Sequence, residues 1–115
     1  MILETKTRLV EPDITVVEVS GRLNLGNALQ ALESSIKLLI DQGTSKVVVD
    51  VGKLQAIDSS GIGMLIGCRG HMEQAGGDFR VAGAQGAVAS VFQVVHLDRI
   101  VPLDKDVDAS TKALT

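Results

Sequence analysis

One run of consecutive branched apolar residues constrains the fold of this chain more than any other feature of its sequence. Residues 47–51 read Val-Val-Val-Asp-Val. A half-exposed strand alternates apolar and polar residues, whereas an almost continuously apolar run is typical of a strand covered on both faces. The run therefore predicts a central strand in a sheet, and the segments around it must supply the layers that cover that sheet.

The segments before this run predict a hairpin and a helix. Residues 2–10 alternate between apolar or threonine side chains and charged ones, which predicts a half-exposed strand. Residues 14–19 predict a second strand, paired with the first across Glu11-Pro12-Asp13 and ending at Ser20-Gly21. An amphipathic helix follows, with Asn24 or Asn27 as its N-cap and Gly43 at its C-terminal end. Its apolar face is formed by Leu25, Ala28, Leu29, Leu32, Ile36, Leu39 and Ile40.

The segments after the apolar run predict three helices and two strands. A helix of about four turns follows residue 58 and ends at Gly76-Gly77. Residues 78–82 predict a strand, 83–86 a loop and 87–95 a short helix. Residues 100–103 predict a short last strand that lies at an edge or ends at Pro102, because proline cannot donate to a ladder. Residues 104–115 are weakly helical, with packing expected through Ala109, Ala113 and Leu114.

The predicted order β-β-α-β-α-β-α-β-α indicates a single α/β domain over residues 1–115, with a mixed, mostly parallel sheet. The 115 residues are 45% hydrophobic, but only 2% are aromatic. The core must therefore be built from valine, isoleucine, leucine and alanine.

Charge and composition exclude several classes of function. The net charge is −3 and no Lys/Arg cluster is present, so we expect no direct binding to nucleic acid. The longest stretch without a formal charge, residues 81–97, is short and interrupted by glycine and polar residues, so we expect no membrane insertion. The N-terminal residues do not resemble a signal peptide. The single cysteine, Cys68, excludes an internal disulfide and fits a reducing compartment, so a cytoplasmic protein is predicted.

The candidate functional stretch is Asp58-Ser59-Ser60-Gly61-Ile62-Gly63, between the central strand and the helix that follows it. Aspartate and serine are preferred N-cap residues, because their side-chain oxygens accept the unpaired N–H groups of the first helical turn. One cap is sufficient to start a helix. The remaining hydroxyl lies where the helix dipole favours negative charge, and we interpret it as a modifiable switch.

Catalytic interpretations of this stretch are weak. The G-x-S-x-G frame of serine hydrolases is absent, and His71 lies about three turns further along the same helix, out of reach of Ser59. Asp50 and Asp58 flank the loop, but nothing in the sequence raises the pKa of either carboxyl group as acid–base catalysis requires. Asp58 is more simply an N-cap. We therefore expect a protein that is not an enzyme and needs no cofactor.

Metal and nucleotide sites are also disfavoured. Cys68 and His71 could share a helix face, but a structural zinc site needs about four ligands and no second pair exists. Gly61, Gly63 and Gly67 do not match the spacing of a dinucleotide-binding loop. These glycines have two other interpretations, which can both hold. They allow close packing of the helix on the sheet, or they leave a bare surface that admits a partner's backbone.

The motif and its surroundings resemble the STAS domain, and more narrowly bacterial anti-sigma factor antagonists. The resemblance rests on residues 47–51 followed by Ile57 to Gly63. It extends to Gly21-Arg22-Leu23-Asn24, which is similar to the turn before the family's first helix, and to Gly76-Gly77 with the strand after it. Val88, Phe92 and residues 97–100 are similar to the family's closing helix and strand. The resemblance therefore covers nearly the whole chain.

The resemblance implies a mechanism. The unphosphorylated antagonist binds an anti-sigma factor that is also a serine kinase, and the sigma factor is released. The kinase phosphorylates the serine directly after the motif aspartate, here Ser59, with Ser60 as the alternative site. A metal-dependent phosphatase of the PP2C type reverses the modification. The residues implied in partner binding are Asn24, Asp58, Ser60, Gly61, Ile62 and Gly63.

Position 24 departs from the family pattern. Asn24 stands where the family has an aspartate before its first helix, which keeps the shape of the side chain but removes its charge. An alternative function keeps the fold and omits the switch. The chain would then be a constitutive interaction subunit, such as a scaffold component of a stress complex or the partner of a lipid-transport ATPase.

Overall fold

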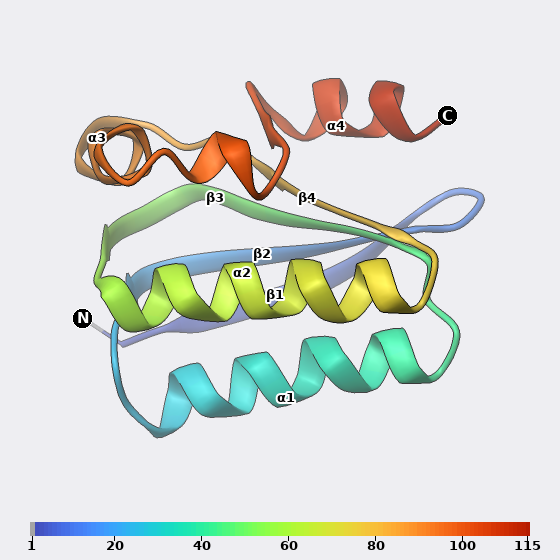
Figure 1. Cartoon of the computed structure of the whole chain (residues 1–115), viewed down its shortest axis with the longest axis horizontal. Helices are drawn as coiled ribbons and strands as arrows, with labels where there is room; N and C mark the ends of the chain where they lie inside the picture. The colour runs from blue at the N-terminus through green and yellow to red at the C-terminus, as the bar shows by residue number, and fades with distance from the viewer. Residues whose placement is uncertain (1) are drawn as a thin grey trace.

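A computed structural model describes residues 2–115 and contains one α/β domain (Figure 1). Its elements follow the order that the sequence predicts, with one added 3₁₀ turn, η1. They are β1 (Glu4–Val10), β2 (Ile14–Leu23), α1 (Asn27–Asp41), β3 (Lys46–Ile57), α2 (Ser59–Gln74), β4 (Asp78–Ala82), α3 (Gly86–Val94), η1 (Leu97–Arg99), β5 (Leu103–Asp104) and α4 (Val107–Leu114).

The five strands form one mixed sheet in the order β1-β2-β3-β4-β5. The hairpin partners β1 and β2 are antiparallel, and every other neighbouring pair is parallel. The sheet is therefore mostly parallel, as predicted, with β3 at its centre and β1 and β5 at its edges.

Helices cover both faces of the sheet. Helices α1 and α2 lie side by side on one face, and α3 and α4 lie across the sheet from them (Figure 1). Val47, Val49 and Val51 of β3 join the larger core cluster together with residues of α1 and α2. Val48 joins a smaller cluster with Leu114 of α4. The prediction that this strand is covered on both faces is confirmed.

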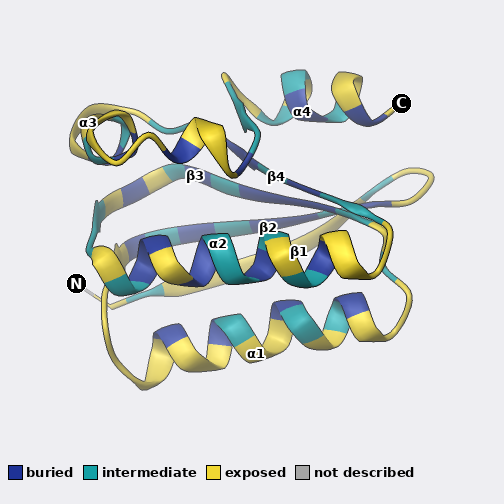
Figure 2. Cartoon of the chain, viewed as in Figure 1, coloured by how far each residue is buried: buried dark blue, intermediate teal, exposed yellow. Residues whose placement is uncertain are grey.

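Three predictions about the strands were wrong in detail. Strand β1 is not half-exposed: residues 4–9 are all exposed, because β1 is an edge strand and, of its neighbourhood, Leu3 is the residue that packs against the core on the α1 side (Figure 2). Strand β2 does not end at Ser20-Gly21. Gly21 adopts a φ of +89° within a register shift, and this irregularity lets the strand continue to Leu23. Strand β5 begins only at Leu103, because residues 100 and 101 form a turn and a bend directly after η1.

The helix ends and faces also differ in places. Neither asparagine caps α1: its N-cap is Gly26, without a side-chain hydrogen bond, and Asn27 is already helical. Gly43 does adopt the left-handed conformation expected after the helix, with a φ of +105°.

On α4 Leu114 is buried, as predicted, and Ala109 is partly buried, but Ala113 is exposed and Ser110 is buried instead. The Ser110 hydroxyl donates to Asp104 at 2.6 Å, and Asp104 accepts from Arg80 Nε at 2.7 Å. The Ser110 hydroxyl can face the core because Asp104 of β5 supplies its acceptor. The spacing of apolar residues along the helix does not reveal this contact.

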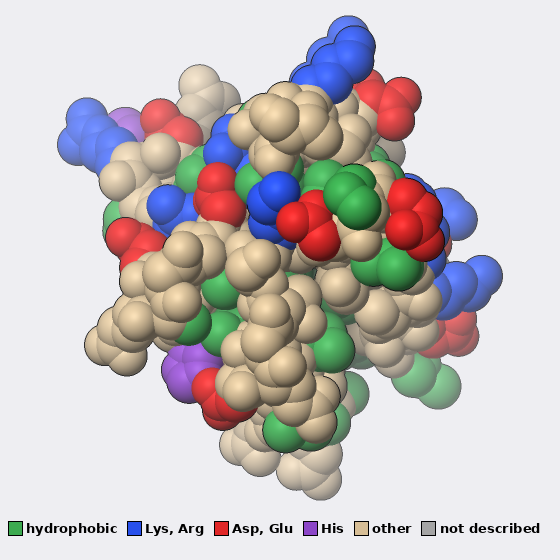
Figure 3. Space-filling model, turned by 90° about the vertical axis from the view of Figure 1, so that its right-hand side faces the viewer, with side chains coloured by type: hydrophobic (Ala, Val, Ile, Leu, Met, Phe, Trp, Pro, Cys, Tyr) green, Lys and Arg blue, Asp and Glu red, His purple; other side chains and the backbone are tan. Residues whose placement is uncertain are grey.

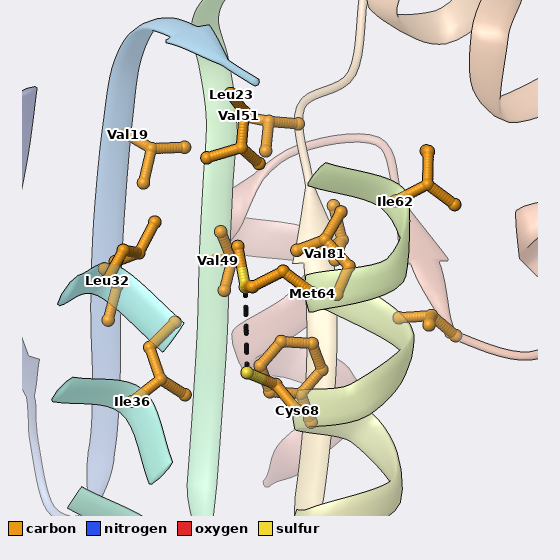
Figure 4. Close-up of a cluster of buried hydrophobic side chains, with 14 of the residues drawn as sticks. Val19, Leu23, Leu32, Ile36, Val49, Val51, Ile62, Met64, Cys68 and Val81 are labelled. Atoms are coloured by element: carbon orange, nitrogen blue, oxygen red, sulfur yellow. Dashed lines mark hydrogen bonds between the residues drawn. The ribbon is translucent and has the colours of Figure 1, made fainter. Parts of the chain in front are cut away.

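Cys68 lies inside the larger core cluster, and its thiol approaches the Met64 sulfur at 3.7 Å (Figure 4). The side chain is fully buried. Burial, with a smaller contribution from Glu33, raises the pKa of the Cys68 thiol to about 12. The thiolate is therefore scarce at neutral pH.

We expect Cys68 to resist thiol reagents in the folded protein. The reacting species is the thiolate, and a raised pKa together with full burial should slow labelling by Ellman's reagent on the order of a hundredfold or more relative to the unfolded chain. The measurement compares labelling rates at pH 8 with and without guanidinium. Equal rates would show that the α2 packing opens readily in the native state.

Candidate functional site

The candidate site is built around the side chain of Asp58, which begins α2. Its Oδ1 accepts from the backbone N–H of Gly61 at 3.0 Å, so Asp58 is the N-cap, as predicted. Its Oδ2 accepts from the backbone N–H of Leu25 at 3.0 Å. The Asp58 N–H in turn donates to the Leu23 carbonyl oxygen at 3.2 Å. One residue therefore joins the start of α2 to the loop before α1.

These contacts also fix the charge of Asp58. Backbone hydrogen bonds from Leu25 and then Gly61 lower the pKa of this carboxyl group below its ordinary value of 3.8. Asp58 is therefore ionised at neutral pH. A negative charge at the N-terminus of a helix also interacts favourably with the helix dipole.

Ser59 and Ser60 occupy the first turn of α2, directly after the cap. Ser59 is exposed, and Ser60 is partly buried. The hydroxyls of Ser35, Ser90 and Ser110 donate to backbone or carboxylate oxygens. Within residues 2–115, neither Ser59 nor Ser60 has a side-chain hydrogen bond of this kind. The Ser59 hydroxyl is thus accessible and has no structural partner there.

The glycines of α2 divide between the two interpretations left open by the sequence. A Cβ on Gly61 would lie 2.4 Å from the Leu23 carbonyl oxygen and 2.7 Å from Ile57 Cγ1, so Gly61 allows close packing. A Cβ on Gly63 or Gly70 would meet nothing within 4 Å. Gly63 is exposed one turn after Ser59, so it leaves a bare surface beside the candidate serine.

The residues implied in partner binding are therefore not equally accessible. Gly61 is buried, and Ile62 is only 8% exposed, so both contribute mainly to packing. Asn24 is exposed, and both of its chain neighbours bond to Asp58, which places it beside the start of α2. The accessible set around Ser59 is Asn24, Ser60 and Gly63.

The prediction that Leu25 is buried on the apolar face of the helix was wrong. The spacing of Leu25 placed it there, but it precedes α1 and is 75% exposed. The signal in the sequence was the neighbouring Gly26, which separates Leu25 from the helix.

The other candidate residues, Asp50, Cys68 and His71, make contacts away from Ser59. Asp50 accepts from the Gly52 N–H at 2.9 Å, and His71 pairs with Asp41 at 2.7 Å. Cys68 faces the core, so it does not share a surface with His71 (Figure 4). Among the described residues, no group of three or more His, Cys, Asp or Glu side chains could hold a metal ion.

The surface charges are mixed in sign, and no described helix suits a membrane span. The end of the molecule seen in Figure 3 has acidic and basic side chains interspersed. The ion pairs include Arg69 with Asp78, and Lys46 with Asp13 at 3.1 Å. No helix of residues 2–115 is long and apolar enough to cross a bilayer.

Replacing Asp58 by asparagine should destabilise the protein and alter its response to acid. Asparagine has one carbonyl oxygen, so it can retain the Gly61 bond but not also accept from Leu25. Because folding lowers the pKa of Asp58, its ionised form stabilises the fold above pH 3.8, and that stability is lost as the pH falls through the folded-state value. Thermal melts between about pH 2 and 7 should show a lower melting temperature for Asp58→Asn at pH 7 and a smaller difference at the acid end. A constant difference across this range would contradict the role of the charge.

Comparison with known proteins identifies related sequences and structures. The family model of the STAS domain matches residues 6–110. A Bordetella bronchiseptica protein, BtrV, named as a candidate anti-sigma factor antagonist, is 27% identical over 95 residues, which cover 83% of this chain and 81% of BtrV.

Two solved structures show the same fold. An anti-sigma factor antagonist from Mycobacterium paratuberculosis superposes with a TM-score of 0.87 at 23% identity, covering 98% of this chain and 94% of that one. The anti-sigma factor antagonist SpoIIAA, in its unphosphorylated form, superposes with a TM-score of 0.81 at 22% identity, covering 96% and 95% of the two chains. Because the family model spans nearly the whole sequence, the chain belongs to the STAS domain family.

Proposed function

We propose that this protein is an anti-sigma factor antagonist controlled by phosphorylation of Ser59. Its unphosphorylated form binds an anti-sigma factor that is also a serine kinase, and this binding releases the sigma factor. The kinase phosphorylates Ser59 and thereby ends the interaction. A phosphatase of the PP2C type restores the active form. In this scheme the protein is a ligand and a substrate, and it catalyses nothing itself.

The observation that carries the proposal is the exposed Ser59 hydroxyl on the first turn of α2, held beside Asn24 and Gly63 by the contacts of Asp58. Relatives support it by name. SpoIIAA, which is named as an anti-sigma factor antagonist, has been solved in unphosphorylated and phosphorylated forms, and both superpose on this chain with TM-scores of 0.81 and 0.76.

The position of Ser59 suits a modification that changes binding but not folding. A phosphoserine carries about −1.5 to −2 charges. The first intrahelical bond of α2 runs from the Ile62 N–H to the Asp58 carbonyl oxygen. The N–H groups before Ile62 have no partner within the helix ladder, and they and the helix dipole favour a negative charge at this end, so the helix tolerates the phosphate. Under a bound partner the same phosphate would have to lose its water. A cost of about 3 kcal/mol there lowers affinity about a hundredfold.

The proposal is tested by incubating the purified chain with anti-sigma serine kinases of its source organism, ATP and Mg²⁺. Mass spectrometry then locates the phosphate. We expect one phosphate on Ser59, none on a Ser59→Ala variant, and unchanged incorporation on Ser60→Ala. Stable binding to an anti-sigma factor without phosphate transfer from any kinase would instead favour a constitutive interaction subunit.

A further inference from the structure

We propose that two copies of this chain associate through the free edges of β1. The two β1 strands would pair antiparallel about a two-fold axis at Lys6, which extends the five-stranded sheet across the dimer. This surface shares no residue with the Ser59 site, so the inference stands independently of the proposed function.

The first observation is that β1 is long, regular and uncovered. It pairs with β2 along all seven of its residues, and within residues 2–115 its other edge has no neighbour in the sheet. Residues 4–9 are all exposed (Figure 2). Proteins usually protect such an edge with proline, bulges, covering elements or charged side chains, because its N–H and C=O groups are a template for a further strand. Strand β1 carries the charged residues Glu4, Lys6 and Arg8, which restrict its partner to a strand of complementary charge. Residues 4–10 contain no proline, and their register with β2 is uninterrupted.

The second observation is that the strand is complementary to itself. Residues 3–9 read Leu-Glu-Thr-Lys-Thr-Arg-Leu. Antiparallel pairing about Lys6 places Leu3 opposite Leu9, Glu4 opposite Arg8, and Thr5 opposite Thr7, each pair occurring twice. Cross-strand pairs of opposite charge and pairs of threonines each stabilise a sheet. This charge complementarity identifies a second copy of the chain as the partner.

The central pair of the proposed dimer is unfavourable by itself, because Lys6 would face Lys6 of the second copy. Like charges directly opposite each other destabilise a sheet. However, Lys6 has Glu18 as its cross-strand neighbour on β2. Each lysine would therefore lie between the other lysine and a glutamate. Glu18 also pairs with Lys53 at 3.2 Å, so it offsets only part of the repulsion.

The third observation concerns the apolar side chains of the strand. Leu3 packs against the larger core cluster, so odd-numbered residues of β1 face the same side of the sheet as α1. A groove of about 320 Å³ opens there between β1 and α1, lined by Leu3, Thr5, Ala28, Ala31, Leu32 and Ser35. Leu9 is 58% exposed on the same face. In the proposed register Leu9 of the second copy lies opposite Leu3, at this groove, and both copies bury Leu9.

Sedimentation equilibrium of the full chain from about 1 µM to 1 mM tests the inference, since weak protein association falls within this range. We expect the wild type to form a dimer within it. Glu4→Arg should raise the dissociation constant about tenfold or more, because it replaces two favourable pairs by two pairs of like charges. Arg8→Glu should have a similar effect. Both residues are exposed, so circular dichroism should show an unchanged fold.

The double variant Glu4→Arg/Arg8→Glu provides the decisive control. It restores opposite charges only in a register that places residue 4 opposite residue 8, so its dissociation constant should return to within about threefold of the wild type. Leu9→Lys should weaken the dimer in either background. A wild type that stays monomeric at 1 mM would overturn the inference, and so would a double variant no better than the single ones.

Discussion

Replacement of Ser59 by glutamate should reduce binding to the anti-sigma kinase at least about a hundredfold while leaving the fold intact. The carboxylate places a negative charge on the first turn of α2, where the dipole contributes about 0.3–1 kcal/mol in its favour. In the complex the same charge must be desolvated, and a cost of about 3 kcal/mol is sufficient for the hundredfold loss. Isothermal titration calorimetry with the kinase that phosphorylates the wild-type chain measures the affinity, and a thermal melt measures the stability.

Ser34→Glu is the matched control for this change. Ser34 is also exposed and helical, but it lies on α1, opposite the buried face formed by Leu29, Leu32, Ile36 and Ile40. The Ser34→Glu variant makes the same change of residue and charge away from the start of α2. Its affinity for the kinase should therefore stay within about twofold of the wild type. Equal losses for both variants would mean that net charge, and not the Ser59 site, controls binding. If Ser59→Glu bound the kinase with full affinity, a negative charge at Ser59 would not control binding.

Replacement of Gly61 by alanine should have the largest effect on stability, a loss of about 3 kcal/mol. Its Cβ would lie 2.4 Å from the Leu23 carbonyl oxygen, which is backbone and cannot rotate away. The same oxygen accepts from the Asp58 N–H, so the N-terminus of α2 would have to move away from β2. We expect a fall in melting temperature on the order of 10–20 °C, measured by calorimetry.

Gly63→Ala and Gly70→Ala are the controls on the same helix. A Cβ at either position meets nothing within 4 Å, so each change should stabilise the protein by up to about 1 kcal/mol through helix propensity. Gly63→Ala should also weaken binding to the kinase, because Gly63 lies beside Ser59 on the accessible surface, whereas Gly70→Ala should not. Equal behaviour of Gly61→Ala and Gly70→Ala would contradict the packing role of Gly61.

The strongest local patterns were sufficient to predict the fold class. The apolar run at 47–51 correctly predicted a strand covered on both faces, and Asp58 was correctly predicted as a helix cap. Both features depend on a few neighbouring residues. The same is true of β4, whose bounds Asp78–Ala82 were predicted correctly from the apolar alternation after Gly76-Gly77.

The remaining features depend on contacts between segments distant in sequence. Asn24 has good capping chemistry, yet the Leu25 N–H beside it bonds to Asp58, 33 residues away, and α1 begins only after Gly26. The exposure of β1 depends on how far α1 extends across the sheet. The role of Gly61 depends on a carbonyl oxygen of β2. No periodicity within one segment contains this information.

The most direct test of the central claim is the phosphorylation state of the protein purified from its own host. Intact mass and phosphopeptide mapping, before and after treatment with a metal-dependent phosphatase, would locate any phosphate. We expect a single phosphate on Ser59, removed by the phosphatase. Absence of phosphate under every growth condition tested, or phosphate only on residues outside the first turn of α2, would contradict this expectation and leave Ser59 as one exposed residue of a constitutive binding surface.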